Sequence, residues 1–152
     1  MRALIQRVSS ARVCNSSSGD VLGSIEAGLV ALIGVTHDDN EAAAKKLASK
    51  LWNVRVFPDP DGTMNVSVAE RHELGEPAGL LVVSQFKLYG NTRKGRRPSF
   101  VEAARPEHAE PLIDLLVAEL RTYGADVQTG RFRTHMAVEL VNDGPVTLMI
   151  ET

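Results

Sequence analysis

Asn142-Asp143-Gly144-Pro145-Val146-Thr147 lies between two apolar runs, 136–141 and 146–150, each of which has the length and composition of a β-strand. Asn, Asp, Gly and Pro are typical of tight turns, so one interpretation is a surface turn that joins the two strands as a hairpin. The other interpretation depends on the Gly144-Pro145 bond, because an X-Pro bond becomes cis at a cost of only about 0.5–1 kcal/mol. A cis bond would present two carbonyl oxygens side by side, as a rigid acceptor for an ammonium group with little room for a side chain beside it.

A second stretch, Ser84-Gln85-Phe86-Lys87-Leu88-Tyr89, follows the apolar run 79–83, which we interpret as a buried strand. Ser84 would be a nucleophile only if a base lay beside it in space, and the sequence shows none. The alternative is a hydroxyl at the end of a strand that hydrogen-bonds to the backbone.

The size and composition indicate one globular domain over residues 1–152, with a net charge of −2. Such a charge argues against strong non-specific binding of nucleic acids but permits a local basic patch. The single cysteine, Cys14, rules out an intramolecular disulfide, and a reducing cytoplasmic setting fits. No run approaches the roughly 20 apolar residues of a membrane span, and the N-terminal residues alternate as a strand and not as a signal peptide.

The periodicity changes several times along the chain. Residues 2–13, 21–25 and 29–35 are expected to form a three-stranded antiparallel meander. A helix is expected after Asp38, which would cap it with Glu41 as the reciprocal partner, and a second helix is expected from Pro106 to Gly124. Short strands are expected at 64–68, 79–84 and 127–129, followed by the C-terminal pair. The sequence therefore predicts a mixed α/β domain with a largely antiparallel sheet that tends to a barrel, and two helices.

The segment 91–99 carries four basic residues, Arg93, Lys94, Arg96 and Arg97. It is either an ordinary solvated loop or a contact for the phosphates of a nucleic acid. No cofactor or metal is expected, because the four histidines are scattered and neither a glycine-rich phosphate loop nor a Gly-x-Ser-x-Gly motif is present.

These stretches together resemble the D-aminoacyl-tRNA deacylase family. The resemblance is carried by four stretches in their order and spacing along the chain. They are residues 2–8, Ser84-Gln85-Phe86, residues 93–100 and Asn142 to Thr147. It covers essentially the whole chain. It implies a carboxylic ester hydrolase that releases D-amino acids from the 3′ end of tRNA, with the 2′-hydroxyl of the terminal adenosine helping to activate the water.

The resemblance also implies roles for individual residues. Backbone N–H groups near Ser84, Gln85 and Phe86 would stabilise the oxyanion. Gly144-Pro145 would hold the α-ammonium group and reject L-amino acids, whereas glycine would be rejected poorly. In the family this Gly-Pro reaches into the active site of a second subunit, so a homodimer is implied.

Three further residues resemble binding positions of the family. Arg7 would orient the Gly-Pro pair, although a cation at a strand edge is the alternative. Phe132 and Met136 would line the adenine pocket, although packing in the core is the alternative. Lys87 departs from the family, which usually has threonine there; since the substrate brings its own hydroxyl, we expect the side chain at this position to be dispensable.

Two other functions remain open at this point. One is an editing module for another mischarged aminoacyl-tRNA, such as the proofreading domain of an archaeal threonyl-tRNA synthetase or a relative that removes L-alanine. Against these stand the lack of a second domain and the intact Ser84-Gln85-Phe86. The other is a non-catalytic tRNA binder that uses residues 93–97, for which Gly144-Pro145 would be unnecessary.

Overall fold

The computed structural model of the chain describes residues 1–152 and contains a mixed sheet built around β1 (Arg2–Asn15). On one side β1 pairs with β2 (Val21–Ile25) and β3 (Gly28–Gly34), and on the other with β8 (Met136–Glu151), in each case antiparallel. The sheet continues from β3 through two parallel neighbours, β6 (Gly79–Ser84) and β7 (Val127–Thr129). The mixed α/β class is confirmed.

The predicted N-terminal meander is wrong, because β2 does not turn back to pair with β3. Ile25 lies opposite Ala11 and Gly28 lies opposite Val8, so β2 and β3 run in the same direction along β1 as one interrupted strand. The residues between them continue the path of the chain instead of reversing it.

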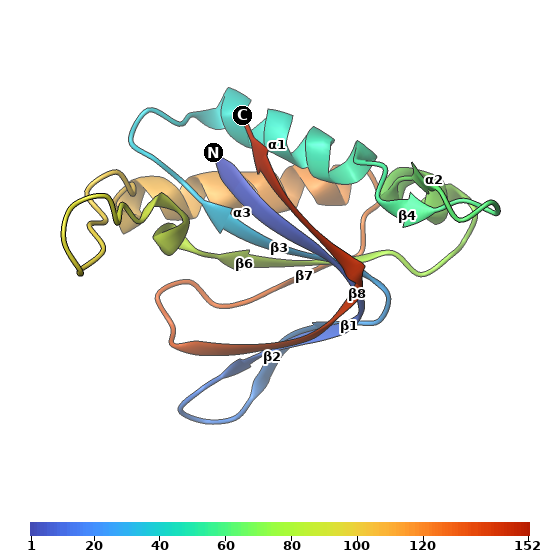
Figure 1. Cartoon of the computed structure of the whole chain (residues 1–152), viewed down its shortest axis with the longest axis horizontal. Coiled ribbons are helices and arrows are strands. Elements are labelled where there is room, and N and C mark those ends of the chain that lie inside the picture. Colours follow the sequence, from blue (N-terminus) through green and yellow to red (C-terminus); the bar gives the residue numbers. More distant parts are fainter.

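The interpretation of residues 142–147 as a hairpin turn between two strands is also wrong, because residues 136–151 form a single strand along β1 (Figure 1). Asn142 pairs with Val8 and Thr147 pairs with Gln6, so residues 143–146 stand opposite Arg7 alone. The turn-like residues therefore form a large bulge within one strand. Such a bulge moves part of an edge strand out of its hydrogen-bonded ladder.

The two ends of the sheet approach each other and nearly close a barrel, as expected. A Cβ atom placed on Gly23 of β2 would lie 2.9 Å from the carbonyl oxygen of Thr129 on β7. Glycine at this position lets the two strands come together.

Two long helices, α1 (Glu41–Asn53) and α3 (Pro106–Thr122), cover one face of the sheet (Figure 1). Their buried leucines pack in one cluster with the inward side chains of β1, β3 and β6; among them are Leu47, Leu51, Leu116 and Leu120. Pro106 opens α3 as predicted, and Gly124 with φ of 92° follows its end. α1 is capped by Asn40 and not by Asp38, because Asn40 accepts the Ala43 N–H.

A third helix, α2 (Val68–Glu73), lies where the sequence predicted the end of a strand and a loop. Its capping box was present in the sequence: Glu70 N–H donates to Ser67 Oγ, and Ser67 N–H donates to Glu70 Oε2 at 2.7 Å. The hydrogen bonds from Ser67 hold the pKa of Glu70 below its usual value. A small ribbon of β4 (Phe57–Pro58) and β5 (Met64–Val66) precedes α2.

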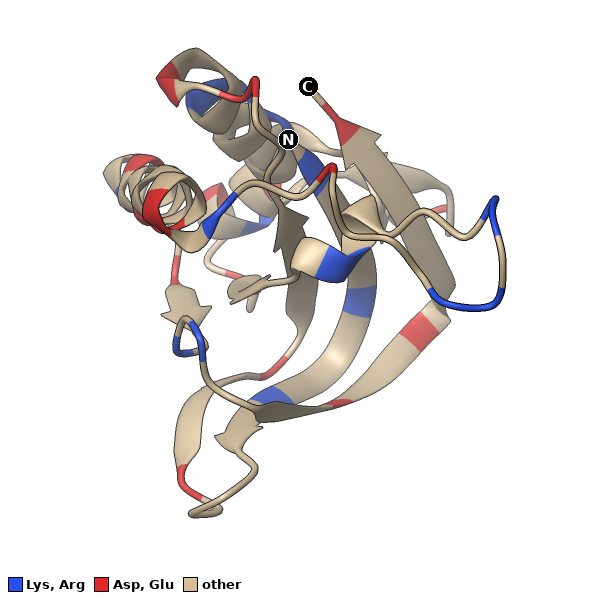
Figure 2. Cartoon of the chain, turned by 90° about the vertical axis from the view of Figure 1, so that its left-hand side faces the viewer, with Lys and Arg blue, Asp and Glu red and all other residues tan.

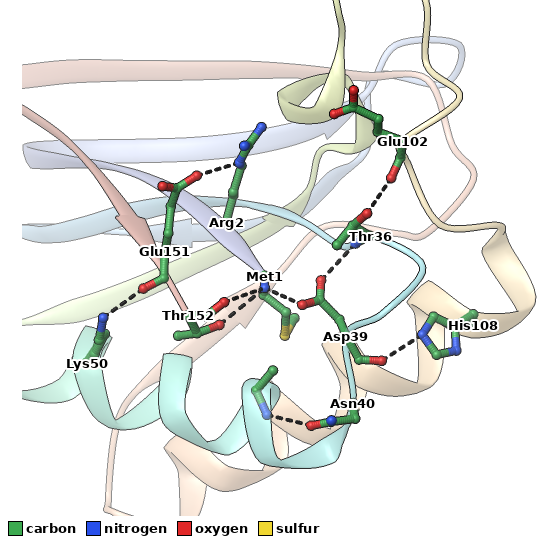
Figure 3. Close-up of polar contacts among 11 residues, drawn as sticks. Met1, Arg2, Thr36, Asp39, Asn40, Lys50, Glu102, His108, Glu151 and Thr152 are labelled. Atoms are coloured by element: carbon green, nitrogen blue, oxygen red, sulfur yellow. Dashed lines mark hydrogen bonds and ion pairs between the residues drawn. The ribbon is translucent and has the colours of Figure 1, made fainter.

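A polar cluster joins the two ends of the chain to the segment before α1 (Figure 3). The ammonium group of Met1 contacts the Asp39 carboxylate and Thr152, and Asp39 Oδ2 accepts the Thr36 N–H at 2.8 Å. His108 of α3 contacts the Asp39 carbonyl oxygen at 2.9 Å. These contacts anchor the outer ends of β1 and β8. None of the helices combines the length and apolar character that crossing a membrane requires.

Candidate active site

A cavity of about 780 Å³ lies where β6 ends. Its walls come from η1 (Phe86–Tyr89), from the start of α3, from the connection between β7 and β8, and from the first part of β8. The cavity brings together five predicted site residues that are up to 52 positions apart in the chain: Ser84, Gln85, Phe86, Phe132 and Met136.

The charge of this cavity is one-sided. Lys87, Arg105 and Arg133 line it together with His135, and no aspartate or glutamate does. Figure 2 views this end of the molecule and shows blue segments on the loops that surround it. A second cavity, of about 450 Å³, has the opposite character: it is lined by Glu26, Glu76 and Asp126 and by no lysine or arginine. Only the larger cavity suits an anionic ligand.

The chain leaves β6 through Gln85 in a conformation that frees one main-chain donor. The Gln85 N–H donates to the Ile33 carbonyl oxygen at 2.6 Å and is occupied. The Lys87 N–H donates to Gln85 Oε1 at 3.3 Å, whereas the Phe86 N–H belongs to the first residue of η1, for which a helix offers no acceptor of its own. Of the three residues expected around an oxyanion, Phe86 therefore offers the free N–H.

No base is paired with Ser84. Its hydroxyl makes no hydrogen bond to a histidine or to a carboxylate, so the arrangement of a serine nucleophile is missing. Tyr89, the last residue of η1, is no base either, because burial raises the pKa of its phenol to about 12. What this part of the cavity can do is polarise a carbonyl group, with water as the attacking group.

Aromatic and thioether side chains form the apolar part of the cavity. Phe86 is 52% exposed and meets Phe100 edge-on at a centroid distance of 5.2 Å. Phe132 is partly buried and packs against the main core, and Met136 packs against the second core cluster while its sulfur accepts the Arg131 N–H at 3.3 Å. Phe132 and Met136 therefore each pack against the core and also line the cavity wall.

The bulge on β8 is held in shape by the side chain of Asn142. Asn142 Oδ1 accepts the Val146 N–H at 2.9 Å, and Asn142 Nδ2 donates to Thr147 Oγ1 at 2.9 Å. The Gly144-Pro145 peptide bond inside the bulge is cis. An asparagine that replaces main-chain partners in this way explains why a turn-like sequence is accommodated within a strand.

Arg7 lies directly behind the bulge and is 9% exposed. Its Nη1 donates to the Val56 carbonyl oxygen at 2.6 Å, and its Nε forms an ion pair with Asp143 Oδ2 at 2.9 Å without the direction of a hydrogen bond. A Cβ atom on Gly144, where φ is 123°, would lie 3.0 Å from Arg7 Nη2 and 2.8 Å from Val146 Cγ2. Only glycine fits between the guanidinium group and the chain.

The bulge and the cavity are separate within the chain, since Gly144, Pro145 and Arg7 do not line the cavity. β8 is accessible to solvent along most of its length and carries exposed apolar side chains, namely Val141, Leu148 and Met149. Exposed apolar residues on an edge strand are typical of a surface that pairs with another chain.

The basic segment 91–99 is an exposed loop closed by the bridge between Asn91 and Ser99. Its four basic side chains form no ion pair and do not line the cavity, although Phe100 at its end does. Sequence reasoning missed Arg105 and Arg133 as lining residues. The position of Arg133 between Phe132 and Met136 was the available signal.

Comparison with known proteins agrees with this geometry. The family model described as D-Tyr-tRNA(Tyr) deacylase matches residues 4–151. Proteins named D-aminoacyl-tRNA deacylase are similar throughout: that of Symbiobacterium thermophilum is 53% identical over 100% of this chain and 96% of its own, and that of Halalkalibacterium halodurans is 49% identical over 100% and 99%.

Two solved structures share the fold. One, the c-Myc DNA unwinding element binding protein, superposes with a TM-score of 0.90 at 33% identity and covers 100% of this chain and 99% of its own. The other, described as a probable eukaryotic D-amino acid tRNA deacylase, superposes with a TM-score of 0.84 at 18% identity over 99% and 98% of the two chains, and supports the fold alone. On its sequence match and its fold, the chain belongs to the D-Tyr-tRNA(Tyr) deacylase family.

Proposed function

We propose that this protein is a D-aminoacyl-tRNA deacylase, a hydrolase that cleaves the ester of a D-aminoacyl-tRNA into free D-amino acid and tRNA. The observation that carries the proposal is the cavity at the end of β6, which combines apolar and aromatic walls with Lys87, Arg105 and Arg133 and has no carboxylate. A nucleotide 3′ end needs both features, because its base stacks on apolar surface and its phosphates are attracted to cations. Membership of the family and the names of the similar proteins support the same activity.

The chemistry assigned to the protein is mainly orientation and stabilisation of charge. The free N–H of Phe86 would bind the oxyanion that forms when water attacks the ester, and one such donor contributes about 3 kcal/mol to lowering the barrier. The 2′-hydroxyl of the terminal adenosine would help to activate the water, since Ser84 has no base beside it. We place the reaction in the cytoplasm, where aminoacyl-tRNA is used.

Selection against L-amino acids is assigned to Gly144-Pro145. Its main-chain carbonyl groups would accept the α-ammonium group of the substrate, which turns the side chain of a D-amino acid toward open space. The side chain of an L-amino acid would meet the main chain itself. Glycine has no side chain to reject, so glycyl-tRNA would also be hydrolysed.

This role requires a second copy of the chain, because the bulge does not line the cavity of its own subunit. The exposed apolar residues of β8 offer a surface for a homodimer, and Arg7 would hold the bulge in a fixed orientation toward the partner. The proposal therefore assigns each active site to two subunits.

The activity is tested by single-turnover release of D-tyrosine and L-tyrosine from matched charged tRNA without added metal. Fast release of the D form with little release of the L form is the expected result. Binding of tRNA without release of either amino acid would support a non-catalytic tRNA binder instead. Preferential release of an L-amino acid would support an editing module of another specificity.

The sharing of the site is tested by mixing two impaired variants, Gly144→Val and Phe132→Ala, and allowing their subunits to exchange. In a mixed dimer the intact bulge of one subunit faces the intact cavity of the other. Random exchange should therefore restore roughly a quarter of the wild-type activity. No gain on mixing, in dimers that have exchanged, would mean that the bulge does not act on the partner's cavity.

A further inference from the structure

Arg133 has a backbone conformation that arginine rarely adopts. Its φ is 57°, and it is the one residue other than glycine with positive φ in the chain. Glycine would adopt this conformation without strain, so arginine here costs folding free energy. Strained positions of this kind cluster at functional sites, where the side chain contributes what the fold does not require.

The Arg133 side chain is exposed, lines the cavity and has no carboxylate within 4.0 Å. Arg105 lines the same cavity from a different element. It is the N-cap residue of α3, but its side chain makes no capping hydrogen bond and no ion pair. Two guanidinium groups without protein partners thus border one cavity that contains no acidic side chain.

From this arrangement we propose that Arg133 and Arg105 bind the internucleotide phosphates next to the terminal adenosine of the tRNA substrate, an inference that rests on the proposed deacylase function. A guanidinium group matches a phosphate with two parallel hydrogen bonds. A base stacked on the apolar wall of Phe132 and Met136 would then lie between these two arginines and the ester. The basic loop 93–97 does not line the cavity. Its side chains could contact only phosphates farther along the RNA strand.

The test compares two substrates, D-tyrosyl-tRNA and D-tyrosyl-adenosine, which has the same ester but no phosphate. Arg133→Ala and Arg133→Gly should each lower kcat/KM for the tRNA ester about tenfold and leave hydrolysis of the adenosine ester at the wild-type rate. Arg105→Ala should act in the same direction. Arg131→Ala is the matched control, because Arg131 is an exposed arginine of the same connection that does not line the cavity.

Arg133→Gly separates binding from folding. Its melting temperature should equal or exceed that of the wild type, because glycine relieves the strained backbone. A decrease in tRNA activity without a decrease in stability would therefore not come from damage to the fold. If both substrates lost activity equally, Arg133 would be supporting the cavity wall and the phosphate assignment would be overturned.

Binding of uncharged tRNA gives a readout that does not need turnover. Each lost phosphate contact on a single strand should reduce the slope of log K against log salt by about 0.7. An unchanged slope in Arg133→Ala would overturn the assignment whatever the turnover. A reduced slope in a protein that hydrolyses neither ester would support the phosphate site and reject the deacylase activity.

Discussion

The cavity at the end of β6 and the bulge on β8 are built in opposite ways. The cavity is concave and its walls come from several elements, so its shape depends on the packing of the whole chain. The bulge projects from one edge strand and is held by two side chains, Asn142 within it and Arg7 behind it. The difference means that the nucleotide binding proposed for the cavity and the amino acid selection proposed for the bulge would depend on separate, differently supported parts of the chain.

The largest effect is expected from Gly144→Val. The new side chain would be forced against Arg7 and Val146 at a backbone φ of 123°, and the displaced bulge should lower single-turnover deacylation of D-tyrosyl-tRNA about 100-fold. Gly19→Ala is the control, since Gly19 also has positive φ but nothing within 4 Å. Full activity in Gly144→Val would show that the bulge has no role in deacylation and that the cavity acts without it.

A smaller but still large effect is expected from Leu148→Glu, which places a charge among the exposed apolar residues of β8. Sedimentation should show dissociation into monomers, and deacylation should fall by at least tenfold because each cavity loses its partner's bulge. Val21→Glu changes an even more exposed apolar residue, on β2, and should leave the assembly intact. A fully active monomer of Leu148→Glu would contradict a shared site.

Phe132→Ala tests the cavity side alone. Loss of a ring that stacks on a base costs about 1–3 kcal/mol, so the variant should bind D-tyrosyl-tRNA roughly ten times more weakly. The preference for the D form should be unchanged, because the bulge is intact. Since Phe132 also packs against the core, the melting temperature is measured in parallel, and a lost preference would show that the two regions are not independent.

The smallest effect is expected from Lys87→Ala, which should retain activity to within about threefold of the wild type. The oxyanion donor is assigned to the Phe86 main chain, and the lysine side chain makes no contact that orients it. Single-turnover rates at two salt concentrations measure the effect. Complete loss of activity would mean that Lys87 has a catalytic role and that the chemistry extends beyond the main chain.

The helices and the buried strands were predictable because their signals are local. Ala44, Leu47, Ala48 and Leu51 repeat at helical spacing and all four are buried on α1. The capping box of α2 was equally local, at Ser67 and Glu70, but was overlooked in favour of a short strand.

The partners of the strands were not predictable from local signals. Residues 26–28 have the length of a hairpin connection and residues 142–145 have the composition of a turn, but each segment lies within an interrupted strand along β1. Whether turn-forming residues reverse the chain or bulge out of it depends on the neighbour. Here the neighbour is β1, which is far away in sequence from β8 but continuous along both halves of it.

By itself, the sequence determined the fold class and the two long helices and predicted the residue types of the site, because propensity, periodicity and motif spacing are properties of neighbouring residues. Only the tertiary structure decided that five of the site residues share one cavity, that Arg7 lies behind Gly144, and that Arg105 and Arg133 border the cavity with no acid beside them. Those facts depend on which segments pack together, and burial of apolar surface over the whole chain selects that arrangement.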